Sequence, residues 1–216
     1  MKQVKILDAG FEILTPLSEA NGADSGLEIL RQIERAGRVC YKSEAKITDE
    51  SCKTFVKNLI ERGHEAMIEH VSLSVKFICD RGVSHEIVRH RIASYAQEST
   101  RYCNYSADKF GNEIAVIRPC FFTDDDSRYE IWREAMLAAE KSYFALLAAG
   151  ATPQEARAVL PNSLKTELIV TMNLREWRHF FKLRTDAAAH PQMREIACAL
   201  LDKLKSLIPV VFDDIR

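Results

Sequence analysis

The chain has 216 residues, of which 47% are hydrophobic and 28% charged, as is typical of one soluble globular domain. Its 30 Lys and Arg residues nearly balance its 31 Asp and Glu residues, and the resulting net charge of −1 argues against a generic polyanion binder. There are only 8 glycines, and neither a G-x-G-x-x-G nor a Walker A stretch occurs. Phosphates would therefore have to be held by side chains and helix N-termini, not by a glycine loop.

Apolar periodicity and capping residues predict the elements in the first half of the chain. These are a strand over 4–7, a helix over 27–36 ended by Gly37, a helix capped by Thr48 and ended by Gly63, an alternating strand over 71–79, and a short helix that begins at Ser84 and carries Arg89. Residues 93–106 show neither a helical nor a strand period, so we expect a loop there.

The second half of the chain contains clearer capping signals. The expected elements are a strand over 114–117, an Ala-rich helix from 124–126 to Gly150, a capping-box helix from Thr152 to Pro161, a strand over 165–172, a helix from Asn173 to Arg184 and a last helix from Pro191. Helices and strands mix without a regular βαβ alternation. This mixture predicts the α+β class, or an irregular α/β arrangement.

The six cysteines contain no C-x-x-C pair, so a zinc ribbon is not expected. Four of them lie within apparent core patterns: Cys40, Cys52, Cys79 and Cys198. The N-terminus lacks the apolar segment of a signal peptide, and no apolar run approaches the roughly 18 residues of a membrane span. We therefore expect a single domain over residues 1–216 with free thiols, in the reducing cytoplasm and without membrane contact.

Metal and thiol chemistry find little support in the sequence. The stretch from His64 begins like the H-E-x-x-H zinc motif but has Ile in place of the second His, and the stretch from His85 fails in the same way. No metal site is therefore expected. Cys120 follows a predicted strand and is a candidate nucleophile, although a cysteine beside Phe121 and Phe122 is more often a buried apolar residue.

The segment from Arg89 to Tyr102 is the most informative part of the sequence. Burying an unpaired charge costs several kcal/mol, so the adjacent Arg89, His90 and Arg91 cannot all face a core. A solvated helix face would explain them. The segment that follows also supplies hydrogen-bonding groups, which suits a site for a small anion. These groups are Ser94, Gln97, Ser99 and Arg101.

Arg-His-Arg followed by seven residues and Ser is the signature of flavin-dependent thymidylate synthases, and Arg89-His90-Arg91…Ser99 matches it in full. Other stretches also resemble this family in the expected order: Arg38–Cys40, Gly63–His70, Ala156–Pro161 and Asn173–Arg184. The resemblance covers residues 4–210. It implies a single domain with a mixed, mostly antiparallel sheet flanked by helices.

The resemblance implies synthesis of dTMP from dUMP. Methylenetetrahydrofolate would be the one-carbon donor, FAD the hydride carrier and NADPH the reductant of the flavin, so that the protein supplies orientation and electrostatics. Members of the family are homotetramers whose subunits share each active site.

Roles for individual residues also follow from the resemblance. Contacts with FAD are implied for His64, Glu69, Arg89, His90, Arg91, Gln97, Asn173, Arg175 and His179. Contacts with dUMP are implied for Glu86, Ile87, Val88, Arg89, Gln97, Glu98, Ser99, Thr100, Arg101, Arg157 and Arg184. Arg101 would hold the phosphate, and Ser99 would position the substrate without acting as a nucleophile.

Arg184 is the implied catalytic residue. In the family, an Arg at this position polarises the uracil ring and assists ionisation at N3. Hydride from the reduced flavin then adds to C6 and makes C5 nucleophilic without an enzyme thiol. The alternative is that Arg184 is simply a cation near a helix C-terminus, where positive charge is favoured.

The chain departs from the family pattern at four positions. Gln97 stands where many members have Glu, and His179 where some have Asn; both keep hydrogen-bonding ability. Ala66 stands where some members have Thr and offers only backbone groups. Cys40 replaces Ser and is a weak donor.

Two other functions remain as alternatives. A nucleic-acid-binding module could use the arginines with Tyr95, Tyr102 and Tyr105 as stacking platforms, but the net charge of −1 argues against a nucleic acid polymer as partner. A thiol-dependent methyltransferase could instead use Cys120.

Overall fold

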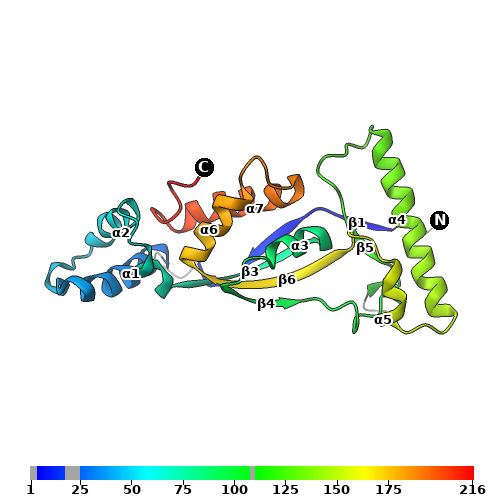
Figure 1. Ribbon diagram of the computed structural model, residues 1–216, viewed down its shortest axis with the longest axis horizontal. Coiled ribbons are helices and arrows are strands. Elements are labelled where there is room, and N and C mark those ends of the chain that lie inside the picture. The colour runs from blue at the N-terminus through cyan, green and yellow to red at the C-terminus, as the bar shows by residue number, and fades with distance from the viewer. Residues whose placement is uncertain (1–3, 18–24, 108–109) are drawn as a thin grey trace. The chain divides into compact units, whose positions relative to one another are not determined.

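The computed structural model describes residues 4–17, 25–107 and 110–216 (Figure 1). Helices and strands alternate irregularly along the chain, which confirms the predicted α+β class. The chain divides into two compact units. Unit 1 is made of the described residues of 1–10, 77–89 and 95–169, and unit 2 of those of 11–76, 90–94 and 170–216. The expectation of one domain over 1–216 stays a prediction.

Four strands form the main sheet in the order β2-β3-β6-β4. They are β2 (Gly10–Ile13), β3 (Ser72–Asp80), β6 (Lys165–Asn173) and β4 (Ala93–Gln97). The Leu174 amide donates to the Val71 carbonyl at 2.9 Å, and the Arg81 amide donates to the Leu164 carbonyl at 3.1 Å. Because the residue number rises in one strand as it falls in the other, β3 and β6 are antiparallel. A separate parallel pair joins β1 (Lys5–Leu7) to β5 (Ala115–Ile117).

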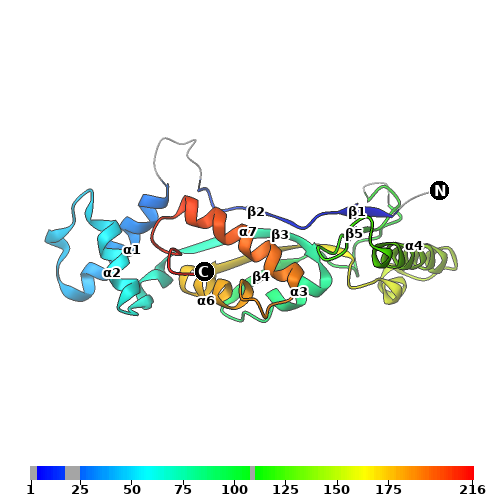
Figure 2. The same cartoon turned by 90° about the horizontal axis from the view of Figure 1, so that it is seen from above.

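Unit 2 contains two helical groups. The first consists of α1 (Ser25–Tyr41), the 3-10 turn η2 (Glu44–Lys46), α2 (Ser51–Glu61) and the 3-10 turn η3 (Glu65–His70), and α1 and α2 lie side by side (Figures 1 and 2). In the second, α6 (Leu174–Arg184) packs against α7 (Pro191–Leu207). The Trp177 indole donates to the Leu73 carbonyl at 3.2 Å, which fixes α6 against β3.

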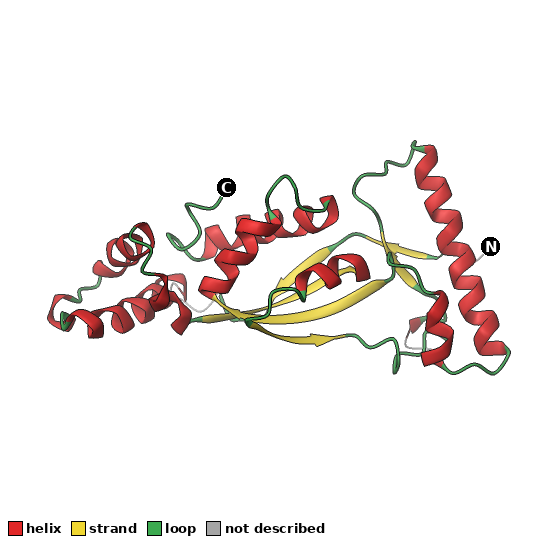
Figure 3. Cartoon of the chain, viewed as in Figure 1, coloured by secondary structure: helices red, strands yellow, loops and turns green. Residues whose placement is uncertain are grey.

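Unit 1 is built around an apolar cluster. Its helical elements are α3 (Arg81–Ile87), α4 (Ser127–Ala148), α5 (Pro153–Ala156) and the 3-10 turn η5 (Arg157–Val159), shown in red in Figure 3. The long helix α4 packs against α5 and η5. The buried residues of the cluster come from β5, from α4 and α5, and from segments outside the helices and strands: Val4, Tyr105, Ile114, Val116, Met136, Tyr143, Ala156 and Leu164.

Capping residues account for three of the helix starts that were predicted correctly. The Asn173 side chain accepts a hydrogen bond from the Glu176 amide at 2.9 Å and begins α6. Asp126 caps α4 in the same way, and Thr152 and Glu155 form the expected capping box. The strands predicted over 4–7, 71–79, 114–117 and 165–172 are all present, and α7 begins at Pro191 as expected.

Several predictions for the first half of the chain are wrong. Helix α2 begins at Ser51, not at Thr48, because the Ser51 hydroxyl accepts the Thr48 amide at 2.9 Å and holds those residues in a turn. Helix α3 begins at Arg81, since the Asp80 carboxylate accepts the Val83 amide at 2.7 Å, and it ends before Arg89. The segment expected to be a loop over 93–106 begins with strand β4, because pairing in the sheet overrides its weak local pattern.

Helix α1 does not end at Gly37, as predicted, but runs on to Tyr41. Gly37 is a packing position. A Cβ atom there would lie 2.6 and 2.8 Å from two ring carbons of Phe55, so the glycine lets α1 and α2 approach closely. An isolated glycine within a helical pattern can therefore mark a close helix contact as well as a C-terminus.

We expect Gly37→Ala to lower the free energy of unfolding by roughly 1–2 kcal/mol, because the clash with Phe55 outweighs the better helix propensity of alanine. Urea unfolding would measure the change. Gly10→Ala is the matched control, since a Cβ at Gly10 meets no atom within 4 Å. A Gly37→Ala variant as stable as the wild type would contradict this account of the α1–α2 contact.

None of the helices in the described ranges is long and apolar enough to cross a membrane. The six cysteines are all free thiols. Cys52 and Cys79 are buried as expected, but Cys40 is exposed and Cys198 only half-buried. Cys120 is also exposed, so the interpretation of it as a buried apolar residue is wrong.

Candidate functional site

The residues predicted to form the site fall into two groups, which we describe separately. Unit 2 holds His64, Glu69, His90, Arg91, Asn173, Arg175, His179 and Arg184. Unit 1 holds Glu86, Ile87, Val88, Arg89, Gln97, Glu98, Ser99, Thr100, Arg101 and Arg157. In each group, hydrogen bonds join residues that are far apart in the sequence.

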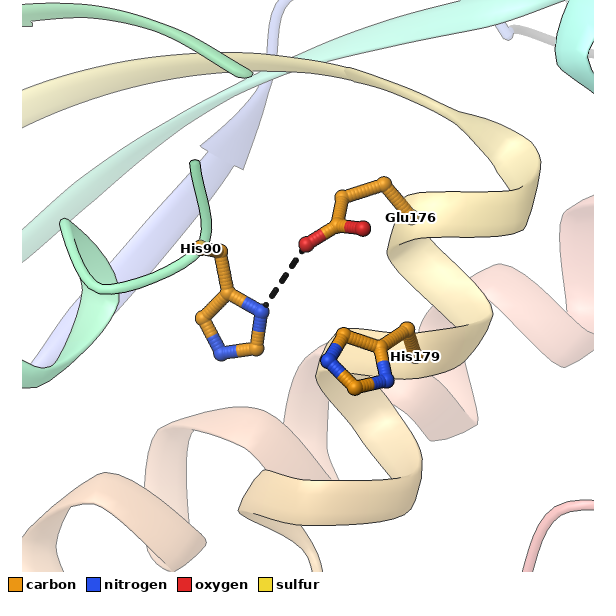
Figure 4. A group of neighbouring side chains, drawn as sticks. All are labelled: His90, Glu176 and His179. Atoms are coloured by element: carbon orange, nitrogen blue, oxygen red, sulfur yellow. Dashed lines mark hydrogen bonds and ion pairs between the residues drawn. The ribbon is translucent and has the colours of Figure 1, made fainter. Parts of the chain in front are cut away.

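The centre of the unit 2 group is the imidazole of His90, which is buried although it stands between two exposed arginines. Its Nδ1 atom lies 3.1 Å from a carboxylate oxygen of Glu176, as the dashed line in Figure 4 marks. Its Nε2 atom lies 3.1 Å from the Nε atom of Arg184. His90 therefore links the first turn of α6 to the last residue of that helix.

These contacts determine the protonation of His90. The Nε–H group of arginine can only donate, so Nε2 of His90 must accept and carry no proton. Burial, together with the positive charge of Arg184 and the neighbouring His179, lowers the pKa of His90 to about 4. His90 is therefore a neutral imidazole near pH 7, with its proton on Nδ1 facing Glu176.

His179 projects from α6 towards the same point (Figure 4). Its ring centroid lies 5.5 Å from that of His90, and one ligand atom each from His90, Glu176 and His179 lie within 4.8 Å of one another. Sequence spacing did not anticipate this grouping. A metal would need a lone pair on one of the ring nitrogens of His90, but Nε2 accepts from Arg184 and Nδ1 carries the proton.

The other members of the unit 2 group lie on or near η3 and the start of α6. Arg175 donates to Glu69 at 2.6 Å and also lies 3.8 Å from Glu65. His64 bonds to the Tyr41 hydroxyl through Nδ1 at 3.1 Å. These exposed side chains place both donors and acceptors on one part of the surface, although the two carboxylates offset part of the charge of Arg175.

Besides His179, two other departures from the family pattern lie in unit 2. Cys40 Sγ lies 3.8 Å from the sulfur of Met67, and Ala66 is exposed within η3. Arg91 is exposed as well.

In unit 1, side-chain hydrogen bonds fix the end of β4 and the loop that follows it. The Gln97 amide donates to the Ser84 hydroxyl at 2.9 Å. The Glu98 carboxylate accepts from the Tyr105 hydroxyl at 3.0 Å and from Lys165 at 3.1 Å. Burial and the adjacent Glu98 together raise the pKa of Tyr105, so the phenol keeps its proton and remains a donor. Glu98 therefore anchors this loop through its side chain.

The next residues of the loop meet the capping-box segment. The Arg157 guanidinium donates to the Thr100 hydroxyl at 3.3 Å across 57 residues of sequence. Arg101 is exposed and lies over the ring of Tyr102 at 5.4 Å, and its amide donates to the Ser99 hydroxyl at 3.3 Å. Two arginines and two hydroxyls thus gather around one loop, as binding of a phosphate requires.

The segment before the signature is partly buried. Ile87 is fully buried, and its carbonyl accepts the Tyr95 hydroxyl at 3.0 Å. Glu86 and Val88 are half-buried, and Arg89 is exposed beyond the end of α3. The side chain of Ile87 therefore packs in the core and can line a ligand only through its backbone.

A cavity of about 360 Å³ lies beside this loop in unit 1, lined among others by Glu98, Tyr105, Lys165 and Glu167. Lys165 bridges the two carboxylates, at 3.1 Å from Glu98 and 2.6 Å from Glu167. The acidic lining makes this cavity a poor site for phosphate.

Sequence reasoning missed several residues that hold the two groups in place. Glu176, Lys165 and Ser84 lie within predicted helices and strands, but the sequence predicted no role for them. Their partners lie 86, 67 and 13 residues away. No spacing pattern could have revealed them, because these contacts depend on the tertiary fold.

A family model and individual relatives of this chain indicate the same protein family. The family model described as "Thymidylate synthase complementing protein" matches residues 27–210. A flavin-dependent thymidylate synthase from Geobacter sulfurreducens is 35% identical over 186 residues, covering 83% of this chain and 78% of that protein. One from Pyrococcus abyssi is 34% identical over 174 residues, covering 79% of this chain and 70% of that protein.

A solved structure supports the same fold. A UMP/dUMP methylase, PolB from Streptomyces cacaoi, bound with 5-Br UMP, superposes with a TM-score of 0.77 at 20% identity and covers 98% of this chain and 96% of that one. The family match spans the signature Arg89-His90-Arg91…Ser99 and the whole of α6. The chain therefore belongs to the flavin-dependent thymidylate synthase family.

Proposed function

We propose that this protein makes dTMP by reductive methylation of dUMP, with methylenetetrahydrofolate as one-carbon donor, FAD as hydride carrier and NADPH as reductant. The proposal rests on one observation above all. The family match over residues 27–210 includes every residue proposed for the site, from His64 to Arg184.

The chemistry of the side chains in unit 2 suits a flavin dinucleotide. Exposed Arg91 and Arg175 offer cations to a pyrophosphate, and exposed His64 and His179 offer hydrogen-bonding groups to a polar ring system. We assign the flavin to these residues together with Glu69, His90 and Asn173, and to Arg89 and Gln97 of unit 1. When bound, FAD would take hydride from NADPH and pass it to the nucleotide.

The unit 1 group is assigned to dUMP. Arg101 and Arg157 supply guanidinium forks for the 5′-phosphate, and the hydroxyls of Ser99 and Thr100 add short hydrogen bonds. Glu86, Ile87, Val88, Arg89, Gln97 and Glu98 complete this assignment. Since the Glu98 carboxylate is held by Tyr105 and Lys165, it would shape the loop and leave the backbone of the loop for the nucleotide.

Arg184 is proposed to act on the uracil ring. A guanidinium next to the pyrimidine would stabilise negative charge that develops on the ring, which activates C5 for carbon–carbon bond formation without an enzyme thiol. The neutral His90 supports this role because it accepts a hydrogen bond from Arg184 without adding a competing positive charge.

We further propose a homotetramer with shared active sites, as the resemblance implies. Placement in the cytoplasm rests on the free state of the six cysteines, which suits a reducing compartment.

The first test is the colour and turnover of the purified protein. It should be yellow, with flavin absorbance, and should convert dUMP to dTMP only when methylenetetrahydrofolate and NADPH are both present. A colourless protein that takes up no flavin from added FAD, yet shifts an oligonucleotide in a gel, would favour the nucleic-acid-binding alternative.

Arg101→Ala should weaken binding of dUMP about 10- to 100-fold, because one hydrogen bond to a charged group is worth about 1.5–3 kcal/mol. Titration of the flavin absorbance with dUMP would measure the dissociation constant. Arg133→Ala, which removes an exposed arginine from α4, is the matched control. An unchanged dissociation constant in Arg101→Ala would contradict the assignment of Arg101 to the phosphate.

Cys120→Ala should leave the rate of dTMP formation within about two-fold of the wild type, because the proposed chemistry uses no thiol. The exposed position of Cys120 makes this the strictest test of the thiol alternative. The buried Cys79 is no substitute as nucleophile, since burial raises the pKa of its thiol to about 12. Complete loss of turnover in Cys120→Ala would favour the thiol-dependent methyltransferase.

A further inference from the structure

We propose that Glu176 is a positioning residue for Arg184 and that it acts through the imidazole of His90. This inference rests on the proposed function, in which Arg184 faces the uracil ring. It adds a buried carboxylate to the site. It also gives His90 a second role, in which the imidazole holds Arg184 in position in addition to contacting the flavin.

The direction of the hydrogen bonds follows from the donor chemistry. Arg184 Nε can only donate, so His90 Nε2 accepts at 3.1 Å, and the single proton of the neutral ring is on Nδ1. This Nδ1–H group then donates to the Glu176 carboxylate at 3.1 Å. The two hydrogen bonds can therefore run in one direction only: Arg184 donates to His90, and His90 donates to Glu176.

Distance explains why an intermediate is needed. Glu176 and Arg184 are eight positions apart on α6, so their backbones are separated by about 12 Å along the helix axis. The carboxylate and the guanidinium each bond to the imidazole of His90 instead. The ring of His90 lies beside α6 and spans the gap.

Glu176 and the imidazole of His90 are both held in place by further contacts. The Glu176 amide donates to the Asn173 side chain at 2.9 Å, and the Glu176 side chain is buried. The His90 ring packs edge-on against Phe180, with centroids 5.0 Å apart. His90 therefore has a fixed ring plane, and through it the Arg184 side chain has a fixed direction.

The carboxylate selects the tautomer that Arg184 needs. Without an acceptor opposite Nδ1, the proton of the neutral ring could move to Nε2. An Nε2–H group would face the Arg184 Nε–H group, donor against donor, and Arg184 would have to turn away. The same reasoning distinguishes this arrangement from a metal site, in which Nδ1 would carry a lone pair for the ion.

The variants Glu176→Leu and Glu176→Gln separate this role from simple packing. Leucine removes the acceptor, while glutamine keeps an acceptor oxygen of the same reach. We would measure the single-turnover oxidation of the reduced flavin by dUMP and methylenetetrahydrofolate together. We expect this oxidation to be about 10- to 100-fold slower in Glu176→Leu, as misplacement of a catalytic group can produce, with little change in flavin content or in dUMP affinity. Glu176→Gln should recover most of the rate. Lys182→Gln, an exposed position on the same helix, is the control.

A spectroscopic readout tests the inference without activity. In protein labelled with ¹⁵N-histidine, with the His90 signals assigned from a His90→Gln variant, His90 should show a protonated Nδ1 and a bare Nε2 near pH 7. This pattern should persist in Glu176→Gln and be lost in Glu176→Leu. Added Zn²⁺ should leave the His90 signals of the wild type unchanged.

The outcomes of these experiments test the role of Glu176 separately from the proposed synthesis of dTMP. A wild type that neither binds flavin nor makes dTMP would defeat the proposed function, while the His90 tautomer would still be measured. Normal flavin oxidation in Glu176→Leu, a proton on Nε2 in the wild type, or Zn²⁺ binding at His90 and His179 would each overturn the role of Glu176. Equal loss in the leucine and glutamine variants would do so too, because the acceptor would then not be what matters.

Discussion

Arg184→Ala should lower the rate of dTMP formation about 10²- to 10³-fold while the protein keeps its flavin, because a single preorganised donor to developing negative charge contributes on that scale. Arg184 is half-buried at the end of α6 and is held by His90 at 3.1 Å. The loss should therefore come from the chemistry on the uracil ring and not from a general collapse of the site. Arg184→Lys should restore little, since a lysine cannot reproduce the fork of the guanidinium or its bond to His90.

Release of tritium from dUMP labelled at C5 is the direct measurement, and flavin absorbance of the same samples reports whether the cofactor stays bound. Arg133→Ala removes an exposed arginine from α4 and should behave like the wild type in both. Full tritium release from Arg184→Ala would refute the catalytic assignment. Loss of flavin together with activity would instead make Arg184 a binding residue.

The elements that the sequence predicted well are those whose boundaries depend on local hydrogen bonds. Asn173, Asp126 and the Thr152 capping box each satisfy amides within three residues of themselves, so the signal and its cause lie in the same short window. The errors are caused by contacts with residues farther along the chain. Gly37 has the pattern of a helix end, but it is a glycine because Phe55 of the neighbouring helix packs against it.

The same distinction holds for the candidate site. The signature from Arg89 to Ser99 is contiguous, so its resemblance to a family could be recognised from residue types and spacing. The side chains that hold it in place come from β6 and α6, many residues away. Whether the residues of the signature perform their implied roles is a prediction that the experiments above address.

His90 shows how the two kinds of information combine. From the sequence, three adjacent cationic or titratable groups could not all face a core. The structure buries the middle one and leaves Arg89 and Arg91 exposed. Burial of His90 does not carry the cost of burying a charge, because the imidazole is neutral. Burial favours the uncharged ring, and both of its ring nitrogens have partners. A histidine can thus be buried in its neutral form, whereas a buried arginine keeps its charge and needs a partner.

The largest effect on stability is expected at Arg178, which is 1% exposed at the centre of unit 2. Its guanidinium forms a bidentate pair with Asp214 at 2.6 and 2.8 Å, donates to Glu65 at 3.1 Å and bonds to the Val211 carbonyl. It therefore ties the C-terminal segment to α6. Loss of one partner of a buried ion pair typically costs about 3–5 kcal/mol.

We expect Arg178→Met to lower the free energy of unfolding at pH 7 by about 3 kcal/mol, near the lower end of that range, because Asp214 is half-exposed and can be solvated when its partner is lost. Arg178 also holds the pKa of Asp214 below its usual value. The stabilisation is thus fully present above the unfolded pKa, about 4, and is lost as the pH falls through the lower folded pKa. Guanidinium unfolding of both proteins should therefore show that the difference in unfolding free energy becomes smaller at acidic pH.

Arg62→Met, at an exposed position, is the control and should change the free energy of unfolding by less than about 0.5 kcal/mol. An Arg178→Met variant with wild-type stability at pH 7 would mean that the C-terminal segment is held by apolar packing alone.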